Sequence, residues 1–175
     1  QHEAENLADH FMKMHARHSQ QAIPNYKFDE SASDPLKRYP RIMQPHRFDA
    51  LSKQWLLDPR VAETLRGLLG EEPLATQSML YFKPPGARGQ AFHQDNYYLR
   101  VRPKSCIAVW VALDSTDLEN GGLMICPRTH TYEVACPEKA DSTTSFTIEY
   151  VPPPAGCVPV PAILEPGDTM FFNGS

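Results

Sequence analysis

The sequence has no run of apolar residues long enough to cross a bilayer as a helix, so we expect no membrane-spanning segment. It also lacks an excess of positive charge: its formal net charge is -4, whereas nucleic-acid-binding domains carry clustered basic residues. The short basic run Arg100–Lys104 is expected to lie on a solvated edge. We therefore predict that neither nucleic acid nor a membrane is a partner.

The four cysteines lack the spacing of a metal site or a disulfide framework. None forms a C-x-x-C pair, and no histidine stands at zinc-finger spacing from them. Cys106 and Cys126 fall in apolar strand candidates, where a thiol behaves as a small apolar side chain. We expect the cysteines to be mostly reduced and structural.

The composition is that of a compact domain. The 175 residues, 41% of them hydrophobic, are enough for one domain with a sizeable core. The chain begins at Gln1 rather than Met, so its natural start can lie further upstream. It contains no signal peptide, and we expect a cytoplasmic protein.

Two helices are predicted in the N-terminal third. Leu7, Phe11 and Met14 recur at helical spacing and give the first helix one apolar face. The second helix runs from Asp58, a typical N-cap that is followed by proline, to Gly70, which can end it. The apolar stripe of this second helix is formed by Val61, Leu65, Leu68 and Leu69.

The later part of the chain predicts short strands and stiff loops. There are 17 prolines, concentrated after residue 80, and proline is excluded from helix interiors. Strand candidates bounded by Gly/Pro turns occur at residues 74–82, 106–113, 123–126 and 169–172. The sequence therefore predicts a mainly β fold with N-terminal helices, in a single domain with a helical part, 1–70, and a sandwich or barrel core, 71–175.

The tripeptide His93-Gln94-Asp95 is the most informative motif. In an extended segment, residues two apart point the same way, so His93 and Asp95 can bind one metal ion. An imidazole and a carboxylate are two of the three protein ligands in the 2-His-1-carboxylate site of non-haem Fe(II) oxygenases. The motif lies between a Gly/Pro-rich stretch, residues 83–89, and an apolar strand candidate, which is a typical place for a functional site.

Several motifs occur together in the order found in a known family. They are the H-Q-D centre, the strand containing Trp110, an N-G-G-L turn followed by P-R-T-H, and the G-D-T-M-F-F segment. Over residues 77–172 the chain resembles the phytanoyl-CoA dioxygenase family of Fe(II)/2-oxoglutarate oxygenases. The resemblance implies a double-stranded β-helix, which is a jelly roll of the cupin kind. It also implies Fe(II), 2-oxoglutarate and O2 as cofactor and cosubstrates, and a small-molecule substrate that is hydroxylated.

The resemblance also assigns roles: iron would be bound by His93 and Asp95, and the cosubstrate would be contacted by Gln77, Tyr81, Gln90 and Trp110. From the residues alone, Gln77 and Tyr81 share one face of the predicted strand 74–82, which can equally be a half-buried packing face. Trp110 is equally consistent with a position in the core. Residues 96–98 follow the metal pair closely enough to meet a substrate.

The chain ends at Asn173-Gly174-Ser175, before the second metal histidine and the 2-oxoglutarate-binding arginine that the family has further on. We therefore expect a C-terminally incomplete piece of a longer enzyme. His130 is expected to lie at the end of a structural strand rather than to bind metal. Two alternatives remain: a non-catalytic jelly-roll binding module, or another cupin-like metalloenzyme that uses His130 or a glutamate as a further ligand.

Overall fold

The computed structural model describes residues 1–20, 22–103 and 105–175, so Lys104 of the basic run lies outside the described residues. Two compact units make up the chain: residues 6–87 form one, and residues 1–5 with 88–175 form the other. The predicted single domain with a boundary at residue 70 stays a prediction. None of the helices in the described ranges has both the length and the hydrophobicity of a membrane span.

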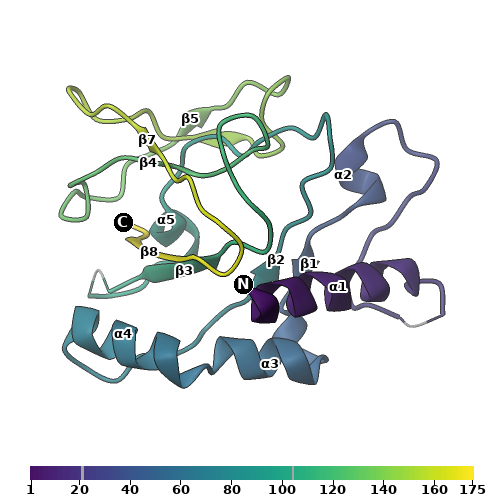
Figure 1. Ribbon diagram of the computed structural model, residues 1–175. Helices are drawn as coiled ribbons and strands as arrows, with labels where there is room; N and C mark the ends of the chain where they lie inside the picture. Colours follow the sequence, from purple (N-terminus) through teal and green to yellow (C-terminus); the bar gives the residue numbers. More distant parts are fainter. Residues whose placement is uncertain (21, 104) are drawn as a thin grey trace. The chain divides into compact units, whose positions relative to one another are not determined.

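Helices dominate the unit of residues 6–87 (Figure 1). Its elements are α1 (His2–Ala16), which begins in the other unit, α2 (Pro35–Arg38), β1 (Ile42–Met43), the 3-10 helix η1 (Pro45–Arg47), α3 (Ala50–Leu56), α4 (Pro59–Leu69) and β2 (Met79–Leu80). β1 and β2 pair antiparallel, with Ile42 opposite Leu80. Both of these side chains are buried, so the short ladder is stabilised by apolar packing as well as by hydrogen bonds.

Both predicted helices are confirmed. In α1, Leu7 and Phe11 are buried, as their spacing predicted. In α4, the Asp58 side chain caps the first turn, and Gly70 ends the helix with a φ of 73°, in the left-handed region that favours glycine. The predicted stripe needs one correction, because Leu68 is 58% exposed. The half-buried face of α4 contains Val61, Leu65 and Leu69.

Short antiparallel strand pairs build the unit of residues 1–5 and 88–175. Its elements are α5 (Asp95–Leu99), β3 (Ile107–Val111), β4 (Met124–Ile125), β5 (Glu138–Lys139), β6 (Glu149–Tyr150), β7 (Val160–Pro161) and β8 (Thr169–Asn173). β3 pairs with β8, β4 with β7 and β5 with β6. The strands predicted at residues 106–113 and 169–172 are confirmed as β3 and β8, whereas the strand predicted at residues 74–82 is reduced to β2.

The described residues do not form the closed double-stranded β-helix that the family resemblance implies. Their strands make four separate two-stranded sheets, and the helices contain more residues than the strands. The prolines of residues 151–161 give a physical reason, because proline lacks the backbone donor that a ladder needs. What is confirmed is the coarser order of N-terminal helices followed by small sheets joined by Gly/Pro turns.

A histidine-centred aromatic cluster packs inside the unit of residues 6–87. The His15 ring stacks on Tyr39 with centroids 4.5 Å apart and meets Phe28 edge-on at 5.5 Å. Its Nδ1 atom shares a hydrogen bond with the Tyr26 hydroxyl at 2.6 Å. Burial, with a smaller contribution from the charge of His18, lowers the pKa of His15, so the folded state favours the neutral imidazole.

The lowered pKa of His15 predicts a loss of stability in acid. Its contribution is fully present above the ordinary histidine pKa and is lost as the pH falls through the folded-state pKa, because the unfolded chain then binds more protons. We expect His15→Phe, which keeps an aromatic ring, to reduce the drop in melting temperature between pH 7.5 and pH 5.5. The same substitution at the exposed His130 should leave that drop unchanged. An equal drop in wild type and His15→Phe would contradict this account.

Candidate metal centre

His93 and Asp95 come together at the start of α5. Gln94, between them, is extended, with φ -111° and ψ 121°, and occupies the N-cap position of the helix. His93 Nε2 lies 3.2 Å from Asp95 Oδ1. The expectation that the whole motif is extended is wrong at Asp95, which is already the first residue of α5. An extended conformation at Gln94 is sufficient to direct both side chains to one place.

Gln94 anchors the motif to the loop at residues 133–135. Its side-chain amide donates a hydrogen bond to the Glu133 carbonyl at 3.2 Å and accepts one from the Ala135 amide at 2.8 Å. A side-chain amide with both donor and acceptor satisfied holds the backbone on either side of it. The middle residue of the motif is therefore structural, while its two neighbours face the site.

The ladder of β3 and β8 holds the start of α5. Beyond the paired strands, the Gly174 amide donates to the Cys106 carbonyl at 2.8 Å. The Gly174 carbonyl in turn accepts from the Asn96 amide at 2.8 Å. Figure 1 shows β3, β8 and α5 gathered near the C-terminal end of the chain. Asp95 therefore starts its helix directly beside the end of the ladder.

Asn96 belongs to this frame and not to a substrate surface. It is 5% exposed. Its side-chain oxygen accepts from the Val101 amide at 2.6 Å, and its nitrogen donates to the Val101 carbonyl and to the Ser175 hydroxyl at 3.2 and 3.1 Å. The expectation that Asn96 meets a substrate is therefore wrong, because its polar atoms are used inside the fold.

The charge state of the pair is set by its surroundings. Burial alone lowers the pKa of His93, but this effect is outweighed. Hydrogen bonds to Asp95 and the Ala91 carbonyl, together with the negative charges of Asp95 and Glu149, raise the pKa above its ordinary value. A proton therefore competes with a metal ion for His93 more strongly than it does at an ordinary histidine.

The pair fits a divalent metal ion. The His93 Nδ1 atom lies 2.9 Å from the Ala91 carbonyl, which fixes the ring and leaves Nε2 facing Asp95. With metal–ligand bonds of about 2.1 Å, two neighbouring ligands of one ion lie about 3 Å apart, and the observed separation is 3.2 Å. Within residues 1–20, 22–103 and 105–175, no group of three His, Cys, Asp or Glu side chains could hold a metal ion. Within the described residues, His93 and Asp95 are thus two candidate ligands, without a third beside them.

Of the residues expected to contact a cosubstrate, Gln90 lies at the pair. Its Nε2 atom is 3.2 Å from His93 Nε2. Trp110 lies on β3 opposite Met170, and strand alternation puts it on the same face as Cys106. Burial and the charge of Asp95 raise the pKa of the Cys106 thiol. Cys106, directly before β3, is therefore near the Asp95 carboxylate, and a contact of Trp110 with the cosubstrate stays a prediction.

Gln77 and Tyr81 belong to the other unit, residues 6–87. Gln77 is half-buried just before β2. Tyr81, just after β2, is 40% exposed, and Arg41 donates a hydrogen bond to its hydroxyl at 3.4 Å. Their contact with a cosubstrate stays a prediction.

Two further residues adjoin the pair: Tyr98, which the sequence placed near it as a possible substrate contact, and Glu149, which the sequence did not connect with it. The Tyr98 hydroxyl donates to Glu149 at 3.1 Å, and the Tyr98 ring meets the His93 ring edge-on at 6.2 Å. Burial, followed by the negative charge and hydrogen bond of Glu149, raises the pKa of Tyr98 to about 12, so the hydroxyl stays protonated. Glu149 lies on β6, far along the chain from the motif, and no local pattern in the sequence indicated it.

Comparison with known proteins finds one family and several relatives. The family model described as phytanoyl-CoA dioxygenase matches residues 2–175. A phytanoyl-CoA dioxygenase of Arabidopsis thaliana is 35% identical over 86 residues, which are 49% of this chain and 30% of that protein. Dioxygenase lolE1 of Epichloe uncinata is 30% identical over 112 residues, 63% of this chain and 41% of that protein.

A more distant relative is a probable alpha-ketoglutarate-dependent hypophosphite dioxygenase of Stutzerimonas stutzeri. It is 27% identical over 106 residues, which are 60% of this chain and 37% of that protein. The chain thus spans between 30% and 41% of the length of these three relatives. No solved structure matches it.

The close approach of Gly174 to Asp95 gives a test of the site. A Cβ atom at Gly174 would lie 2.9 Å from Asp95 Cβ and 3.1 Å from the Cys106 sulfur. Because the Asp95 Cβ is fixed by the helix backbone, Gly174→Ala should displace the carboxylate. We expect a loss of metal affinity of about 10-fold or more, measured by titration of the full-length protein with Mn(II) or Fe(II).

The matched control for this substitution is Gly67→Ala on α4, where an added Cβ meets nothing within 4 Å. It should leave metal affinity unchanged and stabilise the helix by roughly 0.5–1 kcal/mol. A folded Gly174→Ala protein with wild-type metal affinity would show that Asp95 is not a ligand.

Proposed function

The chain belongs to the phytanoyl-CoA dioxygenase family, and on this premise we propose that it carries the metal-binding part of an Fe(II)/2-oxoglutarate-dependent dioxygenase that hydroxylates a small molecule. The observation that carries the proposal is the convergence of His93 Nε2 and Asp95 Oδ1 at 3.2 Å. The name of the bacterial relative, an alpha-ketoglutarate-dependent dioxygenase, supports the same cosubstrate.

In this function the protein side chains bind the metal ion and its cosubstrate, orient them, and exclude water. Fe(II), when bound with 2-oxoglutarate and O2, supplies the oxidation of a C–H bond, and 2-oxoglutarate becomes succinate and CO2. His93 and Asp95 hold the metal, and the Ala91 carbonyl keeps the imidazole in the orientation that binding needs. Gln90 and Trp110 are proposed to contact the cosubstrate, together with Gln77 and Tyr81.

We also propose the fold of the catalytic domain and the further residues that bind the metal and the cosubstrate. Family membership supports a double-stranded β-helix, to which the antiparallel pairs β3–β8, β4–β7 and β5–β6 would contribute. The family resemblance also implies a second metal histidine and a 2-oxoglutarate-binding arginine in addition to His93 and Asp95. Such an arginine would form a bidentate, charge-assisted clamp on a carboxylate.

The metal assignment is tested by removing each ligand. We expect His93→Ala and Asp95→Ala to reduce 2-oxoglutarate-dependent succinate formation by the full-length protein to background and to abolish stoichiometric iron binding. His130→Ala is the control, because the alternative of another cupin-like metalloenzyme would use His130 as a ligand. Retention of succinate formation by either ligand variant would sink the assignment, and loss of iron in His130→Ala would favour the alternative.

The proposed cosubstrate contacts predict a different pattern. Trp110→Phe and Gln77→Ala should weaken the apparent affinity for 2-oxoglutarate by roughly 10- to 100-fold while iron loading stays nearly intact. Ile148→Ala, at a residue that is 73% exposed, should change neither quantity. Equal losses of iron and 2-oxoglutarate binding in the Trp110 or Gln77 variant would indicate damage to the core instead.

A further inference from the structure

A cleft of about 320 Å³ opens beside the metal pair, within the unit of residues 1–5 and 88–175. One wall is the segment directly before His93, and the other is the hairpin of β5 and β6 with its loop. The lining residues are Gln90, Ala91 and Phe92 from the first wall and Ala140, Asp141, Thr144 and Tyr150 from the second. The volume lies at the lower end of the range for small-molecule sites.

Backbone hydrogen bonds fasten the two walls together. The Gly89 amide donates to the Thr144 carbonyl at 2.9 Å, and the Gly89 carbonyl accepts from the Phe146 amide at 2.9 Å. Further along, the Val151 amide donates to the Phe92 carbonyl at 2.7 Å. The cleft is therefore part of the fold, as preformed small-molecule sites usually are.

Gln90 connects the cleft to the metal pair. It lines the cleft, and its side-chain nitrogen lies 3.2 Å from His93 Nε2. Gln90 therefore belongs both to the wall of the cleft and to the immediate surroundings of His93 Nε2. This is the proximity that a substrate of the proposed reaction requires.

The cleft has one charged lining residue among those described, Asp141. Its Oδ1 atom accepts hydrogen bonds from the Thr143 amide at 2.8 Å and the Thr143 hydroxyl at 2.7 Å. These bonds lower the pKa of Asp141. Among the described residues, no cationic side chain contributes to this lowering of the pKa. The carboxylate therefore stays ionised at neutral pH and exposed to a ligand at the rim of the cleft.

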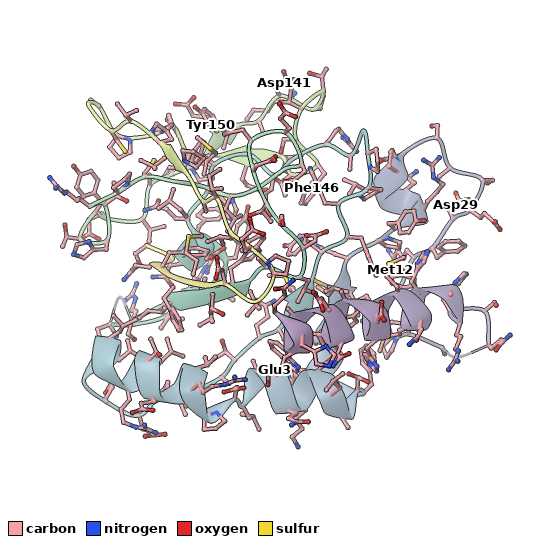
Figure 2. The ribbon with its side chains drawn as sticks, viewed as in Figure 1. Glu3, Met12, Asp29, Asp141, Phe146 and Tyr150 are labelled. Atoms are coloured by element: carbon pink, nitrogen blue, oxygen red, sulfur yellow. The ribbon has the colours of Figure 1, made fainter. Side chains whose placement is uncertain are left out.

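The other charged groups on these elements do not line the cleft. Arg88 donates to the Ser142 and Ser145 carbonyls at 3.1 and 3.3 Å. Glu149 accepts from Tyr98, and neither it nor Glu138 or Lys139 lines the cleft. Figure 2 labels Asp141, on the loop of the hairpin, and Tyr150, on β6. Asp141 gives this wall a negative charge, and Tyr150 gives it an aromatic ring.

We propose that this cleft is the substrate pocket of the dioxygenase and that it accepts a small organic ammonium ion with an apolar frame. The ammonium group pairs with Asp141, the frame packs on Phe92 and Tyr150, and the far end of the molecule reaches Gln90 beside His93. Aromatic faces attract cations in addition to the carboxylate. The assignment of the cleft as a substrate pocket rests on the proposed function. The class of ligand rests on the cleft alone.

The test uses three ligands that share a cyclohexane frame and differ in charge. Cyclohexylammonium, cyclohexanol and cyclohexanecarboxylate are titrated by calorimetry into the full-length protein, first with EDTA and then with Mn(II) and 2-oxoglutarate. We expect the ammonium ion to bind about five- to tenfold more tightly than the alcohol, from an exposed ion pair and a cation–π contact together. The carboxylate should bind most weakly.

Three variants locate the effect. Asp141→Asn keeps the oxygen that accepts from Thr143 but loses the charge, so the preference for the ammonium ion should fall to about twofold or less. Asp117→Asn is the matched control, because Asp117 also accepts backbone hydrogen bonds within its own turn but does not line the cleft. Phe92→Ala should weaken the ammonium ion and the alcohol together, since both pack their frame on the ring.

Equal binding of all three ligands, tighter binding of the carboxylate, or an unchanged preference in a folded Asp141→Asn protein would overturn the proposed ligand class. The EDTA titration is independent of the metal site. Selective ammonium binding in a protein that never loads a metal would overturn the proposed function while supporting the ligand class. Metal-dependent succinate formation without ammonium selectivity would do the reverse.

Discussion

The antiparallel ladder between β3 and β8 is the constraint on which the metal pair depends. Its register continues beyond the strands to Cys106 and Gly174, and the Gly174 carbonyl then binds the Asn96 amide in the first turn of α5. A slip by one residue would move every side chain of the ladder to the opposite face. It would also bring Asn173 or Ser175 to the place where Gly174 leaves room for Asp95.

The site is positioned both by the local His93–Asp95 motif and by contacts from distant parts of the chain. Gln94 brings His93 and Asp95 together through its extended backbone, which is a local effect of two residues. Three contacts from elsewhere then fix that local geometry: the loop at residues 133–135 holds Gln94, Gly174 holds the helix start, and Ser145 holds the Ala91 amide at 3.0 Å. Because these anchors come from separate parts of the chain, His93 and Asp95 are aligned only when the whole unit is folded.

The features that could be predicted from the sequence are those set by neighbouring residues. The helix from Asp58 to Gly70 was readable from its caps, and β3 and β8 were readable from apolar runs that follow Gly/Pro turns. The approach of the His93 and Asp95 side chains was indicated by their spacing alone, whereas metal binding by the pair stays a prediction. α5 was missed because five residues form too short a segment to show a helical period.

The features that could not be predicted depend on tertiary pairing. β5 and β6 have two residues each, too few for an alternating pattern, so neither the hairpin nor the cleft that it lines left a signal. Glu149 beside Tyr98, and Gly174 beside Asp95, meet only because distant strands pair. The same limit applies to the closed β-helix, whose pairings the four separate sheets do not show.

The way in which the two walls of the cleft are fastened separates the lining side chains from the segment that carries His93. Three bonds between the two walls join backbone groups, those of Gly89, Thr144, Phe146, Phe92 and Val151, and backbone bonds tolerate a change of side chain. Side chains form the others: Arg88 donates to the Ser142 and Ser145 carbonyls, and the buried Ser145 hydroxyl accepts from the Ala91 amide and donates to the Thr147 carbonyl. A change at Ser145 would disturb the segment that carries His93, whereas changes at Asp141 or Tyr150 alter the walls alone. The charge of the cleft can therefore vary independently of the metal pair, and Asp141 is the residue at which this chain sets it.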